Sequence, residues 1–246
     1  LKMVLNPMHQ FEIYKIGPEI NLGNINLSFT NASLFMTISA ILILSLLFLG
    51  TKKKSLIPSK IQLITEMSYT FVAKMLNDTA GSSAKSFFPF IFTLFMFILF
   101  CNMVGMLPYS FTVTSHIIVT FMLAAIIFIG VTIIGFVKHG IKYLELFVPK
   151  GVPIILLPLI IIIEIISYLS RPVSLSVRLF ANMMAGHTML KVFGGFVISL
   201  GLLGGWIPLG FSVALTGLEI LVAFLQAYVF AILTCIYLND ALNLHH

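Results

Sequence analysis

The stretch Ser170-Arg-Pro-Val-Ser-Leu-Ser-Val-Arg-Leu-Phe-Ala-Asn-Met-Met-Ala-Gly-His187 places the only two arginines of the chain, Arg171 and Arg178, inside a long apolar region. A guanidinium at membrane depth costs roughly 2.5–3.5 kcal/mol on insertion scales. It cannot escape this cost by losing its proton, because a guanidinium stays protonated at every pH at which proteins work. Arg171, beside Pro172, could extend to the lipid headgroups from a helix end. Arg178 has apolar residues on both sides, and we interpret it as a functional charge.

The composition is that of an integral membrane protein. Of the 246 residues, 59% are hydrophobic and 9% are charged, and the mean hydropathy is +1.11, whereas soluble domains carry about 25% charged residues. The net charge of +6 comes from lysines scattered among loops near apolar segments, as the positive-inside rule produces, so we expect no nucleic-acid partner. Cys101 and Cys235 lie in apolar segments and are expected to be small packing residues. No pattern for a disulfide, a metal, a cofactor or a cleavable signal peptide is evident.

The N-terminal third predicts one membrane helix and one surface helix. Residues 1–28 are mixed and polar and predict an irregular segment on the membrane surface. Residues 29–50 are uncharged and long enough to span a bilayer. Lysines follow at once, so this end is predicted to face the cytoplasm or matrix, with the N-terminus opposite. Residues 61–79 predict an amphipathic helix lying on the surface. Its apolar positions are Ile64, Met67, Phe71 and Met75, and its polar positions are Glu66, Thr70, Lys74 and Asp78.

Residues 86–137 predict a transmembrane hairpin. Two uncharged segments, 86–107 and 111–137, are joined by the turn Pro108-Tyr-Ser. Lysines flank the hairpin at Lys85 and Lys138, and none occupies the turn, which places the turn on the far side. Residues 138–151 predict a cationic loop.

Residues 153–238 predict a long helical hairpin. The first arm, 153–198, would extend some 65–70 Å as one helix, against a hydrocarbon core about 30 Å thick. The arm must therefore be broken or strongly tilted, and its polar residues favour a nearly horizontal course. Glycines between 194 and 205 supply a bend before the second arm, 206–238. We therefore predict an all-α integral membrane protein, one membrane domain over 1–246, with about five membrane helices plus the interfacial helix.

Polar residues recur at helical spacing along both arms. At 100° per residue, Glu164, Arg171 and Arg178 fall near one face. Ser174 and Asn182 flank Arg178 four positions away on either side. His187 lies about 180° around the helix from Arg178 and some 13 Å along it. On the second arm Glu219 and Gln226 share a face, and Asp240 lies at the inner end.

The residue types suggest a division of labour. Glutamate and histidine can take up and release protons, whereas arginine cannot. Titratable groups on two sides of a fixed cation would make two proton routes with a barrier between them. Alternatives stay open at this point: His187 could be a packing residue, Glu164 and Glu219 could neutralise the two arginines as structural ion pairs, and Asp240 could be a solvated residue at a helix end.

The segment Ser174-Leu-Ser-Val-Arg-Leu-Phe-Ala-Asn-Met-Met-Ala-Gly-His187 closely resembles the signature of the subunit a family of F-type ATP synthases. Further stretches resemble the family nearly from end to end. They are His9-Gln-Phe-Glu-Ile13, Ser28-Phe-Thr-Asn31, Pro108-Tyr-Ser-Phe-Thr-Val-Thr-Ser-His116, Leu215-Thr-Gly-Leu-Glu219, Leu225-Gln-Ala-Tyr-Val229 and Ile236-Tyr-Leu-Asn-Asp240. Many bacterial members carry an acid at the position of His187 and a histidine at that of Glu219. The exchanged pair resembles mitochondrial and alphaproteobacterial proteins.

The resemblance implies a stator that holds two offset half-channels against a rotating c-ring. Arg178 would promote release of the proton from the ring carboxylate and block a direct leak. Residues of the two half-channels follow by position: His187, Glu219, Asn182 and Gln226 on the outer side, Glu164 and Asp240 on the inner side, with Ser174 in the same stripe and Arg171 secondary. Peripheral-stalk (b-type) and other membrane-sector subunits would be further partners.

We therefore predict a proton-translocating subunit that is coupled to ATP synthesis but is not itself an enzyme. It lacks a Gly-rich P-loop and is expected to bind no nucleotide. The predicted location is the mitochondrial inner membrane, N-terminus in the intermembrane space and C-terminus in the matrix, or alternatively an alphaproteobacterial inner membrane. A self-contained secondary transporter using Glu164 and Glu219 is a second hypothesis, although no internal repeat is evident. A membrane scaffold organised by its arginines is a third.

Overall fold

The computed structural model describes residues 11–16, 21–22, 25–26, 28–52, 57–107, 110–148 and 156–243. The chain divides into two compact units, and several helices contribute to both. The first unit comprises Leu1–Thr65, Met96–His116 and Leu179–Ala227, and the second comprises Glu66–Phe95, Ile117–Arg178 and Tyr228–His246. The predicted turn residues Pro108 and Tyr109, the lysines at 53, 54 and 150, and the histidines at 9, 245 and 246 lie outside the described residues.

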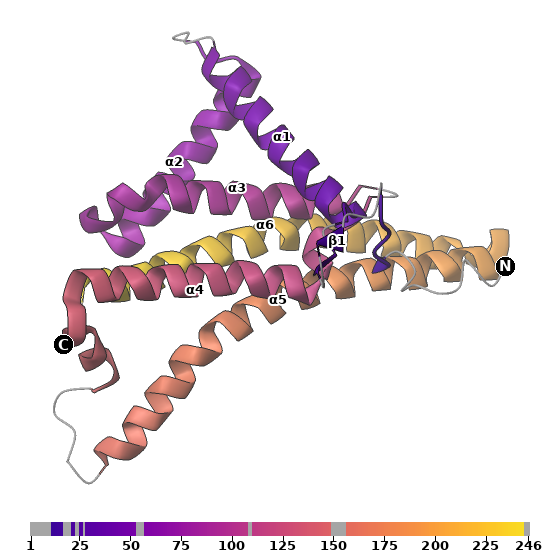
Figure 1. The fold of residues 1–246 in the computed structure, drawn as a ribbon. Helices are drawn as coiled ribbons and strands as arrows, with labels where there is room; N and C mark the ends of the chain where they lie inside the picture. Colours follow the sequence, from indigo (N-terminus) through magenta and orange to yellow (C-terminus); the bar gives the residue numbers. More distant parts are fainter. Residues whose placement is uncertain are drawn as a thin grey trace. The chain divides into compact units, whose positions relative to one another are not determined.

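The described residues form helices apart from one small pair of strands (Figure 1). The α-helices are α1 (Asn31–Lys52), α2 (Lys60–Ala80), α3 (Phe88–Gly105), α4 (Ile117–His139), α5 (Leu157–Gly204) and α6 (Trp206–Leu242). The 3-10 helices are η2 (Ser82–Phe87), η3 (Val113–Ser115) and η4 (Gly140–Phe147). Strands β1 (Asn21–Leu22) and β2 (Ile25–Asn26) pair antiparallel, with Leu22 opposite Ile25.

Five helical stretches of the described chain are long and apolar enough to cross a membrane. They are Asn31–Lys52, Ser83–Gly105, Ile117–Leu144, Leu157–Gly201 and Trp206–Leu242. The prediction of an all-α protein with five membrane helices is therefore confirmed. Large apolar side chains such as Ile126, Ile162 and Val213 are exposed on these helices. In water such surfaces would drive association, whereas lipid tails are an apolar solvent for them. The tilt in the bilayer stays a prediction.

Helix α4 begins later than the sequence predicts, at Ile117 rather than near 111. The residues before it bond through their side chains instead of continuing the helix. The hydroxyl of Thr112 donates to the carbonyl of Gly105, and that of Ser115 donates to the carbonyl of Thr112. Such local hydroxyl bonds compete with helix formation. After α4, the predicted loop 138–151 is helical up to 147, because η4 follows α4 directly.

The long helix α5 has a single sharp break. At Gly201 the backbone takes φ 62°, a left-handed conformation that glycine adopts without the strain of a Cβ atom. Upstream of Gly201 the helix runs on through Pro172. The predicted glycine bend is therefore located at one residue. In the first unit, Figure 1 shows the part of α5 before this break and the beginning of α6 after it running side by side in opposite directions.

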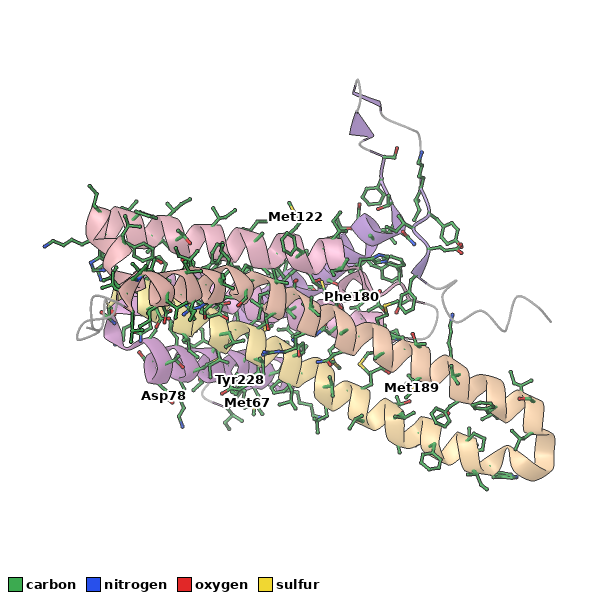
Figure 2. All side chains as sticks on the ribbon, turned by 90° about the horizontal axis from the view of Figure 1, so that it is seen from below. Met67, Asp78, Met122, Phe180, Met189 and Tyr228 are labelled. Atoms are coloured by element: carbon green, nitrogen blue, oxygen red, sulfur yellow. The ribbon has the colours of Figure 1, made fainter. Side chains whose placement is uncertain are left out.

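The packed face of α2 differs from the predicted apolar stripe. Met75 is buried, together with Val72 and Leu76, but Ile64 and Met67 are more than half exposed. Figure 2 labels Met67 and Asp78 on this helix and Tyr228 on α6. In the second unit, the ring of Phe71 lies 5.6 Å from that of Tyr228, so aromatic packing fixes the face of α2. The exposed apolar side chains Ile64 and Met67 suit a helix that also contacts lipid.

The N-terminal segment is tied to α1 rather than irregular throughout. Asn31, the first residue of α1, accepts bonds at Oδ1 from the backbone N–H groups of Tyr14 and Ala32 and donates through Nδ2 to the carbonyl of Glu12. Asparagine is a favoured residue at a helix start because its side chain satisfies free backbone groups there. The bonds from Asn31 therefore hold Glu12 and Tyr14 at the beginning of α1.

Candidate functional site

Four of the predicted site residues meet in the first unit, where α5 and α6 run antiparallel. His187 and Asn182 come from α5, and Glu219 and Gln226 come from α6. Nδ1 of His187 lies 3.6 Å from Oε1 of Glu219, and Nδ2 of Asn182 donates to Oε1 of Gln226 at 2.9 Å. The reversal at Gly201 allows these pairs to form, because it turns the chain so that residues before and after it face each other. We call these four residues the His187–Glu219 cluster.

Gly186 sets the distance between the two helices at this cluster. A Cβ atom added to Gly186 would lie 2.7 Å from Oε1 of Glu219 and 3.0 Å from its Cδ. Real Cβ atoms do not approach other heavy atoms so closely. The residue before His187 therefore has to be glycine for Glu219 to occupy its present position. Gly186 belongs to the segment Ser170–His187, so this segment itself supplies the close approach of the two helices.

Glu219 is a buried carboxylate that lacks hydrogen-bond donors. Its side chain is 6% exposed, and neither oxygen has a hydrogen-bond partner among the described residues. Nε2 of Gln226 is likewise buried without a described acceptor. Burial of these three atoms would cost several kcal/mol if nothing solvated them.

A partly open cavity of 250 Å³ lies beside Glu219. Asn182, Gly186, Met189 and Leu218 are among the residues that line it, and Figure 2 labels Met189 on α5. A polar group at the wall of such a space can bind water.

The second nitrogen of His187 contacts a residue that the sequence analysis did not single out. Nε2 lies 2.9 Å from Oγ1 of Thr112, which is in the turn between α3 and α4. The edge of Phe11 lies against the imidazole, with the ring centroids 6.5 Å apart. Thr112 is separated from His187 by 75 positions, so only its place within a polar run, Thr112-Val-Thr-Ser115, could have indicated it.

A second buried polar contact of the first unit holds the turn before α4 in place. Nδ2 of Asn102 donates to the carbonyl of Ala223 at 3.2 Å, and the hydroxyl of Thr114 donates to Oδ1 of Asn102 at 2.8 Å. Both polar groups of this fully buried amide are thus satisfied, as buried amides require. Next to it, His116 stacks on Phe111, and burial lowers the pKa of His116 below its usual range. We interpret His116 as a neutral packing residue.

The second unit contains a different polar cluster, which we call the Arg171–Asp240 cluster. Nη1 of Arg171 donates to Oδ2 of Asp240 at 3.1 Å. The guanidinium also lies over two aromatic rings, 5.4 Å from the centroid of Tyr168 and 5.0 Å from that of Tyr237. Cation–π contacts of this kind favour a charge that is partly removed from water. Arg171 is thus paired with an acidic residue of α6.

A hydrogen-bonded chain continues from the Arg171–Asp240 cluster to α4. The hydroxyl of Tyr168 lies 2.7 Å from that of Thr132 and 2.9 Å from that of Tyr143. The hydroxyl of Thr132 donates to the carbonyl of Phe128, so it must accept from Tyr168, and Tyr168 in turn accepts from Tyr143. Tyr143 is buried against Gly135, whose lack of a side chain makes room for the ring. In this chain the hydrogen bonds therefore all point one way, from Tyr143 through Tyr168 to Thr132.

The remaining predicted residues of the second unit do not join this cluster. Ser174 and Arg178 are exposed, and Glu164 is half-buried. None of the three has a side-chain hydrogen bond or ion pair to another residue in the part of the chain that the structure describes. Arg171 and Arg178 therefore differ: the first is neutralised within the protein, and the second presents its charge at the surface of α5. Exposed apolar residues, Val173 and Val177, adjoin it.

The fold and these side chains define a class: a polytopic membrane protein with titratable groups packed between two long helices and an exposed cation on one of these helices. The family of the ATP synthase A chain matches residues 33–239. "ATP synthase subunit a" of Pelagibacter ubique is 78% identical over 244 residues, which cover 99% of this chain and all of the relative. Proteins of the same name from Chelativorans and Mesorhizobium japonicum are 58% and 56% identical over 99% and 98% of this chain.

The chain therefore belongs to the ATP synthase A chain family, the subunit a family of F-type ATP synthases. The resemblance and the function class predicted from the sequence are confirmed: this is a proton-translocating, non-catalytic subunit of the membrane sector, and a multi-pass membrane protein.

Proposed function

We propose that this chain carries protons from one side of the membrane to a carboxylate of a rotating c-ring, with Glu219 and His187 as the exchanging pair of the outer half-channel. The observation that carries the proposal is the state of Glu219. A carboxylate that is 6% exposed, lacks a described hydrogen-bond donor and lies beside a cavity is built to take up and release a proton rather than to stabilise a fold.

The amides of the cluster support the proposal. Asn182 and Gln226 do not titrate, but the bond between them holds the two helices together next to Glu219. The buried Nε2 of Gln226 and the cavity beside Glu219 give water molecules both a place and a partner. A proton would then reach Glu219 through water on the outer side.

Arg178 is the fixed charge of the proposal. It has no partner in the described part of the chain, it lies on an exposed surface with Ser174 and Val177, and it cannot give up its proton. A cation in this setting favours ionisation of a carboxylate brought next to it. A ring carboxylate that comes next to Arg178 would release its proton, and the resulting negative charge would neutralise Arg178. The same charge would repel a proton that leaks between the two routes.

On the inner side we propose Glu164 as the exchanging group. Glu164 is half-buried and free of ion pairs to described residues. Asp240 already pairs with Arg171, and this supports a role as a fixed counter-charge in the inner half-channel rather than a carrier. We further propose a c-ring and a b-type peripheral stalk as partners, and an alphaproteobacterial inner membrane in place of a mitochondrial one, because the relatives named above are bacterial.

Proton flux through the assembled complex in vesicles tests the proposal. For Arg178→Ala we expect normal assembly, loss of ATP-driven pumping, and a passive leak that persists or rises. Lys74→Ala removes an exposed cation from α2 and serves as the matched control, with pumping unchanged. Coupled pumping of Arg178→Ala at near wild-type rates would overturn the proposal. Failure of the complex to assemble would favour the scaffold hypothesis. A self-contained transporter predicts flux that survives replacement of the ring carboxylate by an amide.

A further inference from the structure

We infer that Thr112 fixes the tautomer of His187, so that Nε2 always carries a proton and Nδ1 alone exchanges protons with Glu219. This inference rests on the proposed function in one respect, the role of His187 as a proton carrier. Its basis in geometry is independent of that role: two contacts of one hydroxyl group, at 2.9 Å and 3.1 Å.

The direction of the two bonds follows from a count of hydrogens. A threonine hydroxyl has one hydrogen to donate and lone pairs to accept with. The carbonyl of Gly105, 3.1 Å from Oγ1 of Thr112, can only accept, so Thr112 donates to it. Thr112 must then accept from Nε2 of His187, which lies 2.9 Å away. Both contacts are hydrogen bonds only if Nε2 is protonated.

The hydroxyl of Thr112 is held in place from several sides. Thr112 is 4% exposed, and it lies in the turn just before η3, where Ser115 donates to its carbonyl. A Cβ atom at Gly105 would come within 2.8 Å of Cγ2 of Thr112, so the glycine at the end of α3 permits the close approach. Because the hydroxyl acceptor cannot move away, it selects one tautomer of the ring.

This tautomer explains why Glu219 lacks a hydrogen bond to its neighbour. In the neutral ring, Nδ1 carries a lone pair and faces Oε1 of Glu219 at 3.6 Å. When the carboxylate is ionised, two lone pairs face each other, no hydrogen bond forms, and both oxygens are left without a donor, as observed. One proton added between Nδ1 and Oε1 would complete the bond. The pair is thus poised to receive a proton.

The proposed step balances as a simple proton transfer. A hydronium ion in the cavity beside Glu219 loses one O–H bond and becomes water while an Oε1–H bond forms on the carboxylate. That Oε1–H bond then breaks as an Nδ1–H bond forms, which leaves the carboxylate ionised and the ring an imidazolium with its Nε2–H bond intact. His187 therefore works from one side and does not pass protons across its ring from Thr112. Among the described residues, the charged or titratable groups that face it are Glu219 on α6 and Lys191 one turn along α5. Phe11 contributes only a T-shaped ring contact.

Nitrogen NMR on the assembled complex tests the tautomer directly. With ¹⁵N-labelled histidine at alkaline pH, the signals of His187 are identified by their loss in His187→Gln. We expect a protonated Nε2 and an unprotonated Nδ1 in the wild type and in Thr112→Ser, and a mixture or the reverse in Thr112→Val, which keeps the shape but lacks the hydroxyl. A protonated Nδ1 in the neutral wild-type ring, or an unchanged spectrum in Thr112→Val, would overturn the inference.

Proton pumping separates this inference from the proposed function. Loss of one buried hydrogen bond predicts a rate about fivefold lower in Thr112→Val, with near wild-type rates in Thr112→Ser. Thr234→Val is the matched control, because Thr234 is equally buried and bonds only the carbonyl of Phe230 in its own helix. A tautomer that changes in Thr112→Val without any loss of pumping supports the role of Thr112 and contradicts the proton-carrying role of His187.

Discussion

Asp240 and Glu219, both on α6, face basic side chains of α5, and the two pairs are built differently. In the second unit, Asp240 accepts a 3.1 Å hydrogen bond from Arg171, and these side chains are 34% and 28% exposed. In the first unit, Glu219 faces His187 at 3.6 Å without a hydrogen bond, and these side chains are 6% and 12% exposed. The partly exposed pair is joined by a hydrogen bond, whereas the buried pair is not.

The difference teaches which pair can transfer a proton. Arginine keeps its proton at every accessible pH, so Asp240 faces a permanent cation and has nothing to exchange with. Histidine changes its charge near neutral pH, so Glu219 faces a group that can give and take. Two tyrosine rings further restrain Arg171, while a cavity gives Glu219 access to water. We interpret the Arg171–Asp240 cluster as a fixed ion pair and the His187–Glu219 cluster as the pair that transfers protons.

The sharpest test of this comparison exchanges each carboxylate for its amide. For Glu219→Gln we expect ATP-driven pumping to fall more than tenfold in a complex that assembles, because the amide cannot titrate. For Asp240→Asn we expect pumping within about twofold of wild type. Its cost lies in stability, about 1–2 kcal/mol, because both members of the pair are partly exposed. Pumping assays and thermal release of the subunit measure the two effects. Equal loss of pumping in both variants would break the comparison.

A smaller effect is expected from the spacing of the helices at the functional cluster. Gly186→Ala would place a methyl group 2.7 Å from Oε1 of Glu219, so Glu219 must shift away from His187. We expect severalfold slower pumping with little change in assembly. Gly194→Ala on the same helix has open space around its Cβ and is the matched control. If both variants pump alike, the contact between Gly186 and Glu219 does not position the carboxylate.

The helices were predictable because they depend on local periodicity, and apolar runs specify α1 and α3 to α6. Helical spacing placed Glu219 and Gln226 on one face of the second arm. It put Asn182 and His187 on different faces of the first arm, so their grouping with Glu219 and Gln226 came from the family resemblance. What the sequence could not predict are partners supplied by distant segments. Thr112 reaches His187 from a turn 75 positions away. Periodicity on α5 placed Arg171 on a polar face but carried no information about Asp240, 69 positions further along.

The same limit explains the misplaced boundaries. Helix α4 was predicted to begin near 111 because residues 111–137 are uncharged, yet hydroxyl groups at 112 and 115 bond to backbone carbonyls and delay its start to Ile117. For α2, the apolar spacing identified a helix but not the face that packs, because aromatic contacts such as that of Phe71 with Tyr228 decide it. Apolar pattern determines where helices form in lipid, and particular side-chain contacts determine how they pack.

The smallest expected effect tests whether the second unit's hydrogen-bonded chain is purely structural. Tyr143→Phe removes the terminal donor of the chain from Tyr143 to Tyr168 to Thr132, while Tyr168 keeps its bond to Thr132. We expect a loss of about 1 kcal/mol in stability and unchanged pumping. Tyr168→Phe interrupts both bonds, so its cost should be about twice as large. A pumping defect in Tyr143→Phe without any loss of stability would mean that protons use this chain, and that both clusters, rather than one, serve transport.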